Sequence, residues 1–394
     1  MNPIVNPGAK VAGRVIGVQP SATVMVSDRA RAMARQGVDV INLGSGDPDF
    51  DTPSHIVEAA LEAIRSGYTH YVSSAGIAEL RTAIAKKLRK ENGLDFDPDS
   101  EIIVTPGGKL ALFAAVMATV DEGDEVLILD PAWVSYVPCV QLAGGVAVHV
   151  PLSKGDNFRV TEAGLRAKLT SRCKLLILNS PNNPTGRVLT PVELAAIANV
   201  ALAHNLWVLS DEIYERILFD GRQHISVGSL PDMLDRTIII NGFSKTYAMT
   251  GWRLGYVAAK ARLAQEILKI QQHSVTCAGS FTQYAGTAAL TGPHHAVLHM
   301  VEEYRKRRDI ITEGLNSLPG VSCHLPEGTF YAFPDILGTG MSSMEFADML
   351  LSQAKVAVTP GIAFGKSGQG HVRLSFANST QLIEAAIERM RAVL

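Results

Sequence analysis

The sequence has few cysteines, no excess of charge of one sign and no long hydrophobic run. Its four cysteines are widely spaced and form no CxxC pair: Cys139, Cys173, Cys277 and Cys323. Neither zinc nor a disulfide framework is therefore expected, and reduced thiols indicate a cytoplasmic protein. The formal net charge of −2 excludes the strongly basic surface on which nucleic-acid binding depends.

No stretch is long enough to cross a bilayer. The longest apolar run, 110–120, falls short of the roughly 20 residues that a spanning helix needs. The first residues show no basic segment followed by an apolar one, so we expect no export. A chain of 394 residues, 47% of them apolar, has instead the material for a large core, as one large domain with a smaller one or as two comparable domains.

What the sequence does contain is a regular alternation of short apolar runs and helical stretches. Helices are predicted at 27–36, 54–66 and 77–92, with a strand at 38–43. Seven further apolar strands are predicted: 102–105, 126–129, 146–150, 175–178, 207–210, 238–241 and 256–258. Such strands, separated by helices, predict an α/β fold with a mostly parallel, doubly wound sheet of seven strands.

The alternation stops after about residue 291. A long charged helix is predicted at 296–317, and a closing amphipathic helix at 379–393. Between them, 320–335, 355–359 and 371–376 alternate as strands. This pattern is typical of a smaller α+β domain.

Ligands of doubly wound sheets bind beyond the carboxyl ends of the strands. The distinctive polar residues of this chain follow strands directly, at five places: Gly107-Gly108-Lys109, Pro131-Ala-Trp133, 181–186 with Asn183, Asp211-Glu-Ile-Tyr214, and Lys245. Each segment alone is a common turn or cap. Five in succession predict a single site at one edge of the sheet.

Lys245 and Arg253 indicate the chemistry of that site. A lysine at the end of a buried strand, among Gly and Ser, is partly desolvated, which lowers the pKa of its amine and makes it a nucleophile toward a carbonyl. Eight positions later, Arg253 can form a forked contact with a phosphate. Together they suggest an aldehyde cofactor with a phosphate, which is pyridoxal 5′-phosphate.

The run Gly242-Phe-Ser-Lys245-x-x-Ala-Met-x-Gly-x-Arg253-Leu-Gly255 resembles the lysine signature of class I/II aminotransferases, the aspartate aminotransferase-like enzymes of pyridoxal phosphate fold type I. The resemblance covers about residues 14–394. It implies an N-terminal arm at 1–13, a large cofactor-binding domain at 51–291, and a small substrate-closing domain made of 14–50 and 292–394.

The resemblance also implies how the cofactor ring is held. Lys245 is expected to form the resting imine and to move a proton at the substrate Cα. Asp211 is expected to pair with the pyridine nitrogen, which keeps the ring an electron acceptor. Asn183 and Tyr214 match positions that hydrogen-bond the ring hydroxyl oxygen. Trp133 is expected to stack on the ring and to border the substrate.

The cofactor phosphate is expected at a helix start. The amides of Gly107, Gly108 and Lys109 open the apolar helix 110–120, and free N–H groups there bind anions; Arg253 adds its fork. Where the best-known aspartate aminotransferases have Ser this chain has Gly242, so Ser244 is the hydroxyl expected to contribute. By resemblance, Tyr71 reaches the phosphate of a neighbouring subunit, which implies a homodimer.

The substrate is expected to be an amino acid or a 2-oxo acid. By resemblance, Arg373 grips its α-carboxylate, beside Asn183, Trp133 and the backbone of Gly44. Lys109 either meets a side-chain carboxylate of the substrate or serves the cofactor alone. The first interpretation favours aspartate with 2-oxoglutarate, although the branch of the family with Lys at this position also includes prephenate enzymes.

Several alternatives were weighed. An aminotransferase for prephenate, aromatic or other amino acids, and a C–S or β-lyase of the same fold, share the same cofactor residues. A transcription regulator would need an upstream DNA-binding segment, where only an arm is present. The run Gly361-Ile-Ala-Phe-Gly365-Lys366-Ser367 has one residue too few for a P-loop. His295 and His299 have metal-ligand spacing but lack the glutamate of HExxH, so no metal is predicted.

Overall fold

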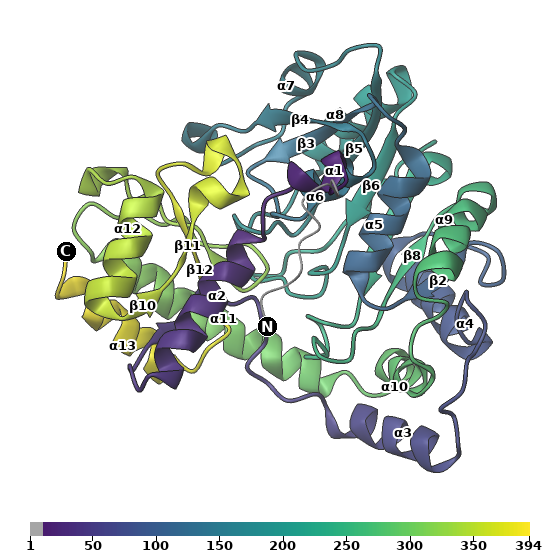
Figure 1. The fold of residues 1–394 in the computed structure, drawn as a ribbon, viewed down its shortest axis with the longest axis horizontal. Coiled ribbons are helices and arrows are strands. Elements are labelled where there is room, and N and C mark those ends of the chain that lie inside the picture. Colours follow the sequence, from purple (N-terminus) through teal and green to yellow (C-terminus); the bar gives the residue numbers. More distant parts are fainter. Residues whose placement is uncertain (1–10) are drawn as a thin grey trace.

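The computed structural model describes residues 11–394 and is built around a seven-stranded mixed sheet (Figure 1). The strands lie in the order β2 (Ile102–Thr105), β8 (Gly255–Ala258), β7 (Thr237–Gly242), β6 (Trp207–Asp211), β5 (Cys173–Asn179), β3 (Glu125–Asp130) and β4 (Val146–Pro151). All neighbours from β7 to β4 pair in parallel, and β8 runs antiparallel to both β2 and β7. The predicted sheet of seven strands is confirmed.

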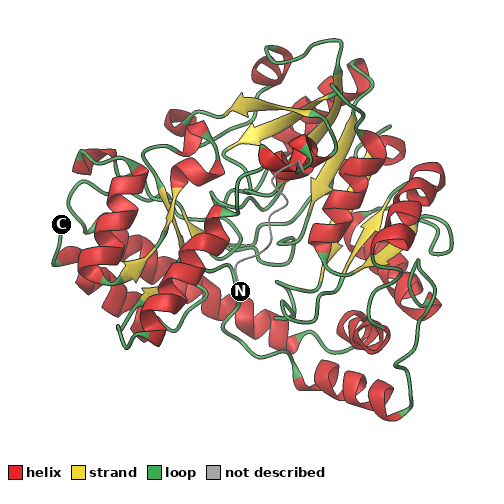
Figure 2. Cartoon of the chain, in the orientation of Figure 1, coloured by secondary structure: helices red, strands yellow, loops and turns green. Residues whose placement is uncertain are grey.

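Helices cover both faces of this sheet, as Figure 2 shows. In β7 the side chains alternate: Ile238 and Ile240 pack toward α5 (Gly108–Thr119) and α9 (Ala261–Ser274), whereas Ile239 packs toward α4 (Ala78–Lys87) and α10 (Ser280–Thr291). Because successive side chains of a strand point to opposite faces, both faces of an apolar strand need a cover. The remaining helices of this part are α3 (Ser54–Arg65), α6 (Tyr136–Leu142), α7 (Glu162–Arg166) and α8 (Pro191–Ala203).

A second, smaller part contains two short sheets. β1 (Ile41–Asn42) pairs in parallel with β10 (Val356–Ala357), and β12 (Val372–Ser375) lies between β11 (Thr359–Pro360) and β9 (Tyr331–Ala332). The helices beside them are α2 (Ala22–Arg35), α11 (His295–Asn316), α12 (Ser343–Met349) and α13 (Thr380–Arg391). The β1–β10 pairing joins the N-terminal segment to the C-terminal part of the chain.

The structure corrects several predicted bounds. The helix predicted at 27–36 begins at Ala22, directly after Ser21 in an extended conformation. The strand predicted at 38–43 is reduced to β1, since β10 offers partners only to Ile41 and Asn42. The helix predicted at 77–92 widens into the π-helix η1 (Leu88–Asn92), and within 320–335 only β9 is strand.

The predicted arm at 1–13 lies almost entirely outside the described residues. Gly13–Ile16 forms the one-turn helix α1. Within residues 11–394, no helix is both long enough and apolar enough to cross a membrane.

Candidate active site

A cavity of about 340 Å³ lies beyond the carboxyl ends of β5, β6 and β7. Its volume is in the range of small-molecule sites. The start of α5, one face of α2 and β12 complete its wall. Eleven of the residues singled out in the sequence line it: Gly44, Gly108, Lys109, Trp133, Asn183, Asp211, Tyr214, Ser244, Lys245, Arg253 and Arg373.

Lys245 projects into this cavity from the turn that follows β7. Its Nζ donates a hydrogen bond to the carbonyl oxygen of Gly46. Burial lowers the pKa of Lys245 to about 8; the nearby Asp47 carboxylate opposes this shift, while the Arg373 guanidinium adds to it. A larger fraction of this amine is therefore neutral near pH 7 than for a lysine in water.

Asp211 ends β6 and is buried. Its Oδ2 accepts a hydrogen bond of 2.7 Å from the hydroxyl of Tyr136, and the side chain of Asn179 donates to its backbone carbonyl at 2.8 Å. Burial raises the pKa of Asp211 to about 6, because the hydrogen bond from Tyr136 compensates only part of the lost hydration. A positively charged N–H group within reach would stabilise this carboxylate.

Arg373 is only 2% exposed, which is unusual for an arginine in a strand. Its Nη1 donates to Oδ1 of Asn183 at 3.0 Å, and its Nη2 donates to the carbonyl oxygen of Gly44 at 2.7 Å. The guanidinium lies 4.3 Å from the ring centre of Tyr331, whose hydroxyl is 3.0 Å from that of Tyr214. Within residues 11–394 this buried cation forms hydrogen bonds but no ion pair with a carboxylate, so it can bind the carboxylate of a ligand.

The start of α5 meets Arg253 closely. Gly107 precedes the helix with φ of +84°, and a Cβ at this position would lie 2.5 Å from Nη2 of Arg253. Gly255 leaves equally little room, since its Cβ would lie 2.5 Å from the amide nitrogen of Gly108. The first amides of a helix have no acceptor within it, so these amides and the guanidinium form one positively polarised pocket for an anion.

Lys109 lies at the other side of this helix start, with its Nζ 5.1 Å from the ring centre of Trp133. Burial lowers the pKa of Lys109, and the Arg253 guanidinium contributes to the shift. The two predicted residues outside the cavity lining are Gly107, which adjoins it, and Tyr71. The side chain of Tyr71 is 86% exposed, and within this chain it does not reach the cavity.

Eleven further lining residues were not predicted, and three of them form hydrogen bonds with or beside predicted residues: Tyr136, Asn179 and Tyr331. Tyr136 follows Trp133 by three positions, and Tyr331 belongs to the aromatic segment 330–333. Aromatic residues in apolar surroundings are ordinarily core residues, so only their hydroxyl contacts with Asp211 and Tyr214 distinguish them.

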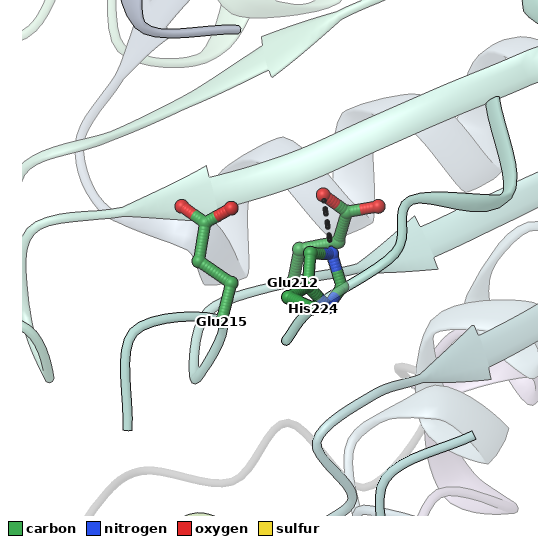
Figure 3. Close-up of side chains that lie close together, drawn as sticks. All are labelled: Glu212, Glu215 and His224. Carbon is green, nitrogen blue, oxygen red and sulfur yellow. Dashed lines mark ion pairs between the residues drawn. The ribbon is translucent and has the colours of Figure 1, made fainter. Parts of the chain in front are cut away.

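A buried polar cluster lies close by and contains Glu212, Glu215 and His224 (Figure 3). Nε2 of His224 is 3.1 Å from Oε2 of Glu212, and the three residues have the ligand types of a metal site. However, the ammonium of Lys87 is ion-paired with Glu215 and donates to Oδ1 of Asn92 at 2.8 Å. Lys87 pairs with Glu215, and His224, whose pKa the neighbouring carboxylates raise against the effect of burial, faces Glu212, so the chain itself supplies a partner for each carboxylate.

The loop at 361–367 also has a partner within the chain. The amides of Lys366 and Ser367 donate to the carboxylate of Asp130 at 3.1 and 3.3 Å. These N–H groups therefore bind a side chain of the protein, where those of a P-loop would bind a phosphate.

Comparison with known proteins places this site in a family. The model of the family described as "Aminotransferase class I and II" matches residues 38–390. An aspartate aminotransferase of Musicola paradisiaca is 46% identical over 96% of this chain and 95% of its own length. An aromatic-amino-acid aminotransferase of Thermococcus litoralis is 45% identical over 91% of this chain and 93% of its own length.

Among solved structures, that of an aspartate aminotransferase from Thermus thermophilus with maleate has a TM-score of 0.94 and 42% identity, covering 98% of this chain and all of the other. That of an aromatic aminotransferase from Pyrococcus horikoshii has a TM-score of 0.89 and 47% identity, covering 94% of this chain and 98% of the other. By sequence along nearly its whole length, and by fold, the chain belongs to the class I and II aminotransferase family.

Proposed function

We propose that this protein is a pyridoxal 5′-phosphate-dependent aminotransferase that moves an amino group between aspartate and 2-oxoglutarate. The observation that carries the proposal is the placement of Lys245, Asp211 and Arg373 around one cavity. These residues supply a nucleophilic amine, a buried carboxylate and a buried guanidinium, which are the groups that an aldehyde cofactor and an amino acid require.

The residues present fit this cofactor. Asp211 is a buried carboxylate with a raised pKa. A protonated ring nitrogen beside it would stabilise its charged form. Arg253, Ser244 and the amides of the α5 start would hold the phosphate, where glycines leave no room for a Cβ. When bound, pyridoxal phosphate supplies an aldehyde for covalent attachment of an amine and a ring that accepts an electron pair.

The chain itself supplies binding, orientation and proton transfer. The amine of Lys245, with its pKa of about 8, accepts a proton from the substrate Cα and later returns one. Asn183 and Tyr214 direct an amide and a hydroxyl into the cavity, where they would hold the ring oxygen, and Trp133 borders it. Arg373, beside Gly44 and Asn183, binds the α-carboxylate and sets the orientation of Cα relative to Lys245.

Lys109 supports aspartate as the amino donor. Its desolvated ammonium lies against Trp133 in the cavity wall, where a second carboxylate of the substrate would restore the lost stabilisation. Prephenate or an aromatic amino acid is the second candidate, because similar proteins named aromatic or aspartate/prephenate aminotransferases share a comparable part of the sequence.

We also propose a domain division, a homodimer and a location in the cell. The β1–β10 pairing supports a small domain made of 14–50 and 292–394, beside a large domain at 51–291 and an arm at 1–13. Exposed apolar side chains on α3, α10 and the loop after α3 support a homodimer in which Tyr71 reaches the partner's phosphate site; they include Leu61, Ile64, Tyr68 and Phe281. The scattered free cysteines support a cytoplasmic location.

Two measurements test the reaction. Borohydride treatment of the protein with bound pyridoxal phosphate should attach the cofactor irreversibly to Lys245. The Lys245→Ala variant should give neither this product nor turnover. A 2-oxo acid should return the cofactor from its amine form to the aldehyde. A C–S or β-lyase would release product without that return, and this result would replace the aminotransferase proposal.

The substrate is tested by an amino-donor panel. Lys109→Ala should lower kcat/KM for aspartate and glutamate by roughly 10- to 100-fold, the range of one charge-assisted contact, and leave aromatic donors almost unchanged. Lys86→Ala, an exposed lysine on α4, is the matched control. An equal loss for all donors would show that Lys109 serves the cofactor alone.

A further inference from the structure

The charges that line the cavity are strongly unbalanced. Five are cationic and one is anionic: Arg31, Lys109, Lys245, Arg253, Arg373 and Asp211. Under the proposed function, Arg253 faces the cofactor phosphate, Asp211 the ring nitrogen and Arg373 the α-carboxylate, while Lys245 reacts with the aldehyde. Lys109 is left for a second carboxylate of the substrate, and Arg31, which pairs with the exposed Asp28, has no role in the proposed chemistry.

Arg31 reaches the cavity from α2 through the geometry of that helix. Thr23, Ser27 and Arg31 are spaced four residues apart and line the cavity together, because side chains at this spacing share one face. The adjoining face of α2 is anchored: Ala30 packs against Leu351 and Ala357. In the smaller part, α2 lies against β1, β10 and β11 (Figure 1). Packing therefore fixes which face of α2 borders the cavity.

The present partner of Arg31 does not hold it firmly. Its Nη1 donates to Oδ1 of Asp28 at 3.1 Å, and the side chains are 65% and 61% exposed. Exposed pairs at this spacing contribute little to stability, because water screens both charges. Within residues 11–394 the other guanidinium donors form no hydrogen bond, so they are available to a ligand, and a rotation of the side chain costs little.

We propose that Arg31 of α2 and Lys109 of α5 together bind the side-chain carboxylate of a dicarboxylic substrate, which makes Arg31 a specificity-determining residue. This inference rests on the proposed function. The two cations extend from different walls of one cavity, Lys109 from the large sheet's helix and Arg31 from the smaller part. A lysine provides a point charge, whereas an arginine fork selects the planar geometry of a carboxylate.

The experiment compares Arg31→Gln and Arg31→Lys with Arg35→Gln. Arg35 is one turn further along α2, exposed and outside the cavity lining, so it controls for loss of charge on this helix. Arg31→Gln should lower kcat/KM for aspartate roughly 10- to 100-fold, mainly through KM, and change an aromatic donor less than about twofold. Arg31→Lys should restore part of the loss. Equal losses for both donor types, or an Arg31→Gln enzyme that matches Arg35→Gln, would overturn the inference.

Binding of succinate, a dicarboxylate that cannot react, separates this inference from the proposed function. Its dissociation constant should rise in both Lys109→Ala and Arg31→Gln. A rise in the Lys109 variant alone would overturn the role of Arg31 and leave the aspartate proposal intact. Turnover of aromatic donors by a wild-type protein that binds no succinate would overturn both.

Discussion

At the scale of single residues, burial decides what the ionisable groups of the cavity can do. Asp211 and Lys245 are opposite charges that burial shifts in opposite directions, to pKa values of about 6 and about 8. Both shifts favour the neutral form, because a low-dielectric site penalises either charge. Without a ligand, burying the two groups lowers the stability of the protein. A ligand that carries a cationic nitrogen and an aldehyde can pair with the carboxylate and react with the amine.

The loss of folding stability caused by the buried carboxylate of Asp211 can be measured in the protein without cofactor. Its folded pKa of about 6 lies above the value of 3.8 for an unperturbed group, so the associated stability is complete below about pH 3.8 and is lost as pH rises through 6. Asp211→Asn should therefore raise the free energy of unfolding of the apoprotein by about 1–3 kcal/mol at pH 7.5 and weaken cofactor binding at least tenfold. Denaturant titration checks the first effect and fluorescence titration the second.

The control for this change is Asp235→Asn, which removes an exposed aspartate and should leave both quantities nearly unchanged. An apoprotein made less stable by Asp211→Asn at pH 7.5 would contradict the prediction. It would mean that the contact with Tyr136 contributes more than the lost hydration costs.

At the scale of elements, the start of α5 depends on the glycine that precedes it, and a second glycine with positive φ, in the loop between α5 and β3, serves as its control. Gly107 has φ of +84°, and Gly123 has φ of +83°, so alanine is strained at either position. Around Gly123 nothing lies within 4 Å of an added Cβ, whereas at Gly107 the Cβ would meet Arg253. The two positions separate backbone strain from loss of the anion pocket.

Gly107→Ala should weaken binding of the cofactor and of inorganic phosphate at least tenfold, because Arg253 must move away from the helix start. Gly123→Ala should lower the free energy of unfolding by about 1 kcal/mol without changing either affinity. Calorimetric titration measures the affinities for the cofactor and for phosphate. Equal affinities in the two variants would show that the phosphate lies elsewhere.

The buried cluster beside β6 and β7 gives a second element-scale prediction. Burial alone would lower the pKa of His224, but the Glu212 and Glu215 carboxylates outweigh it and raise the pKa. The stabilising contribution of His224 is then complete below its unfolded pKa, about 6.5, and is lost as pH rises through the folded value. His224→Gln should destabilise the protein more at pH 6 than at pH 9, whereas exposed His273→Gln should not. A pH-independent loss on unfolding titration would mean that the imidazole is neutral in the cluster.

At the scale of the whole molecule, the site draws on segments far apart in the sequence. Arg373, in the smaller part, donates hydrogen bonds both to the carbonyl oxygen of Gly44 and to Asn183 of the large sheet region. Tyr71 is exposed and does not line the cavity of its own chain, which is expected if a second copy completes the phosphate site. Mixing two variants can test whether Tyr71 of one subunit completes the site of the other.

Lys245→Ala and Tyr71→Ala should each be nearly inactive as homodimers. In a hybrid of the two, one site combines an intact Lys245 with an intact Tyr71 of the partner, so mixing and refolding should restore activity at one of the two sites. A Lys245→Ala protein mixed with Asp211→Ala is the control, because neither hybrid site is then complete. Failure of the first mixture to regain activity would contradict a shared site.

Much of the architecture was predictable because it depends on local pattern. The strands of the large sheet are short apolar runs between helices, and every one of the seven predicted lies in the sheet. The short strands of the smaller part were not predictable to the same extent. β1 and β10 are two residues each and exist only through their pairing with one another, so their bounds are set by a distant partner.

The sequence by itself determined the seven-stranded sheet, the family and the residue types that follow the strands, because periodicity and motif spacing are local properties. Only the tertiary structure decided that Tyr136 contacts Asp211, that Arg373 is buried against Tyr331, and that α2 brings Arg31 to the cavity. Those contacts join segments separated by long stretches of chain. Burial and charge at such meeting points depend on the packing of whole elements, and no local pattern encodes them.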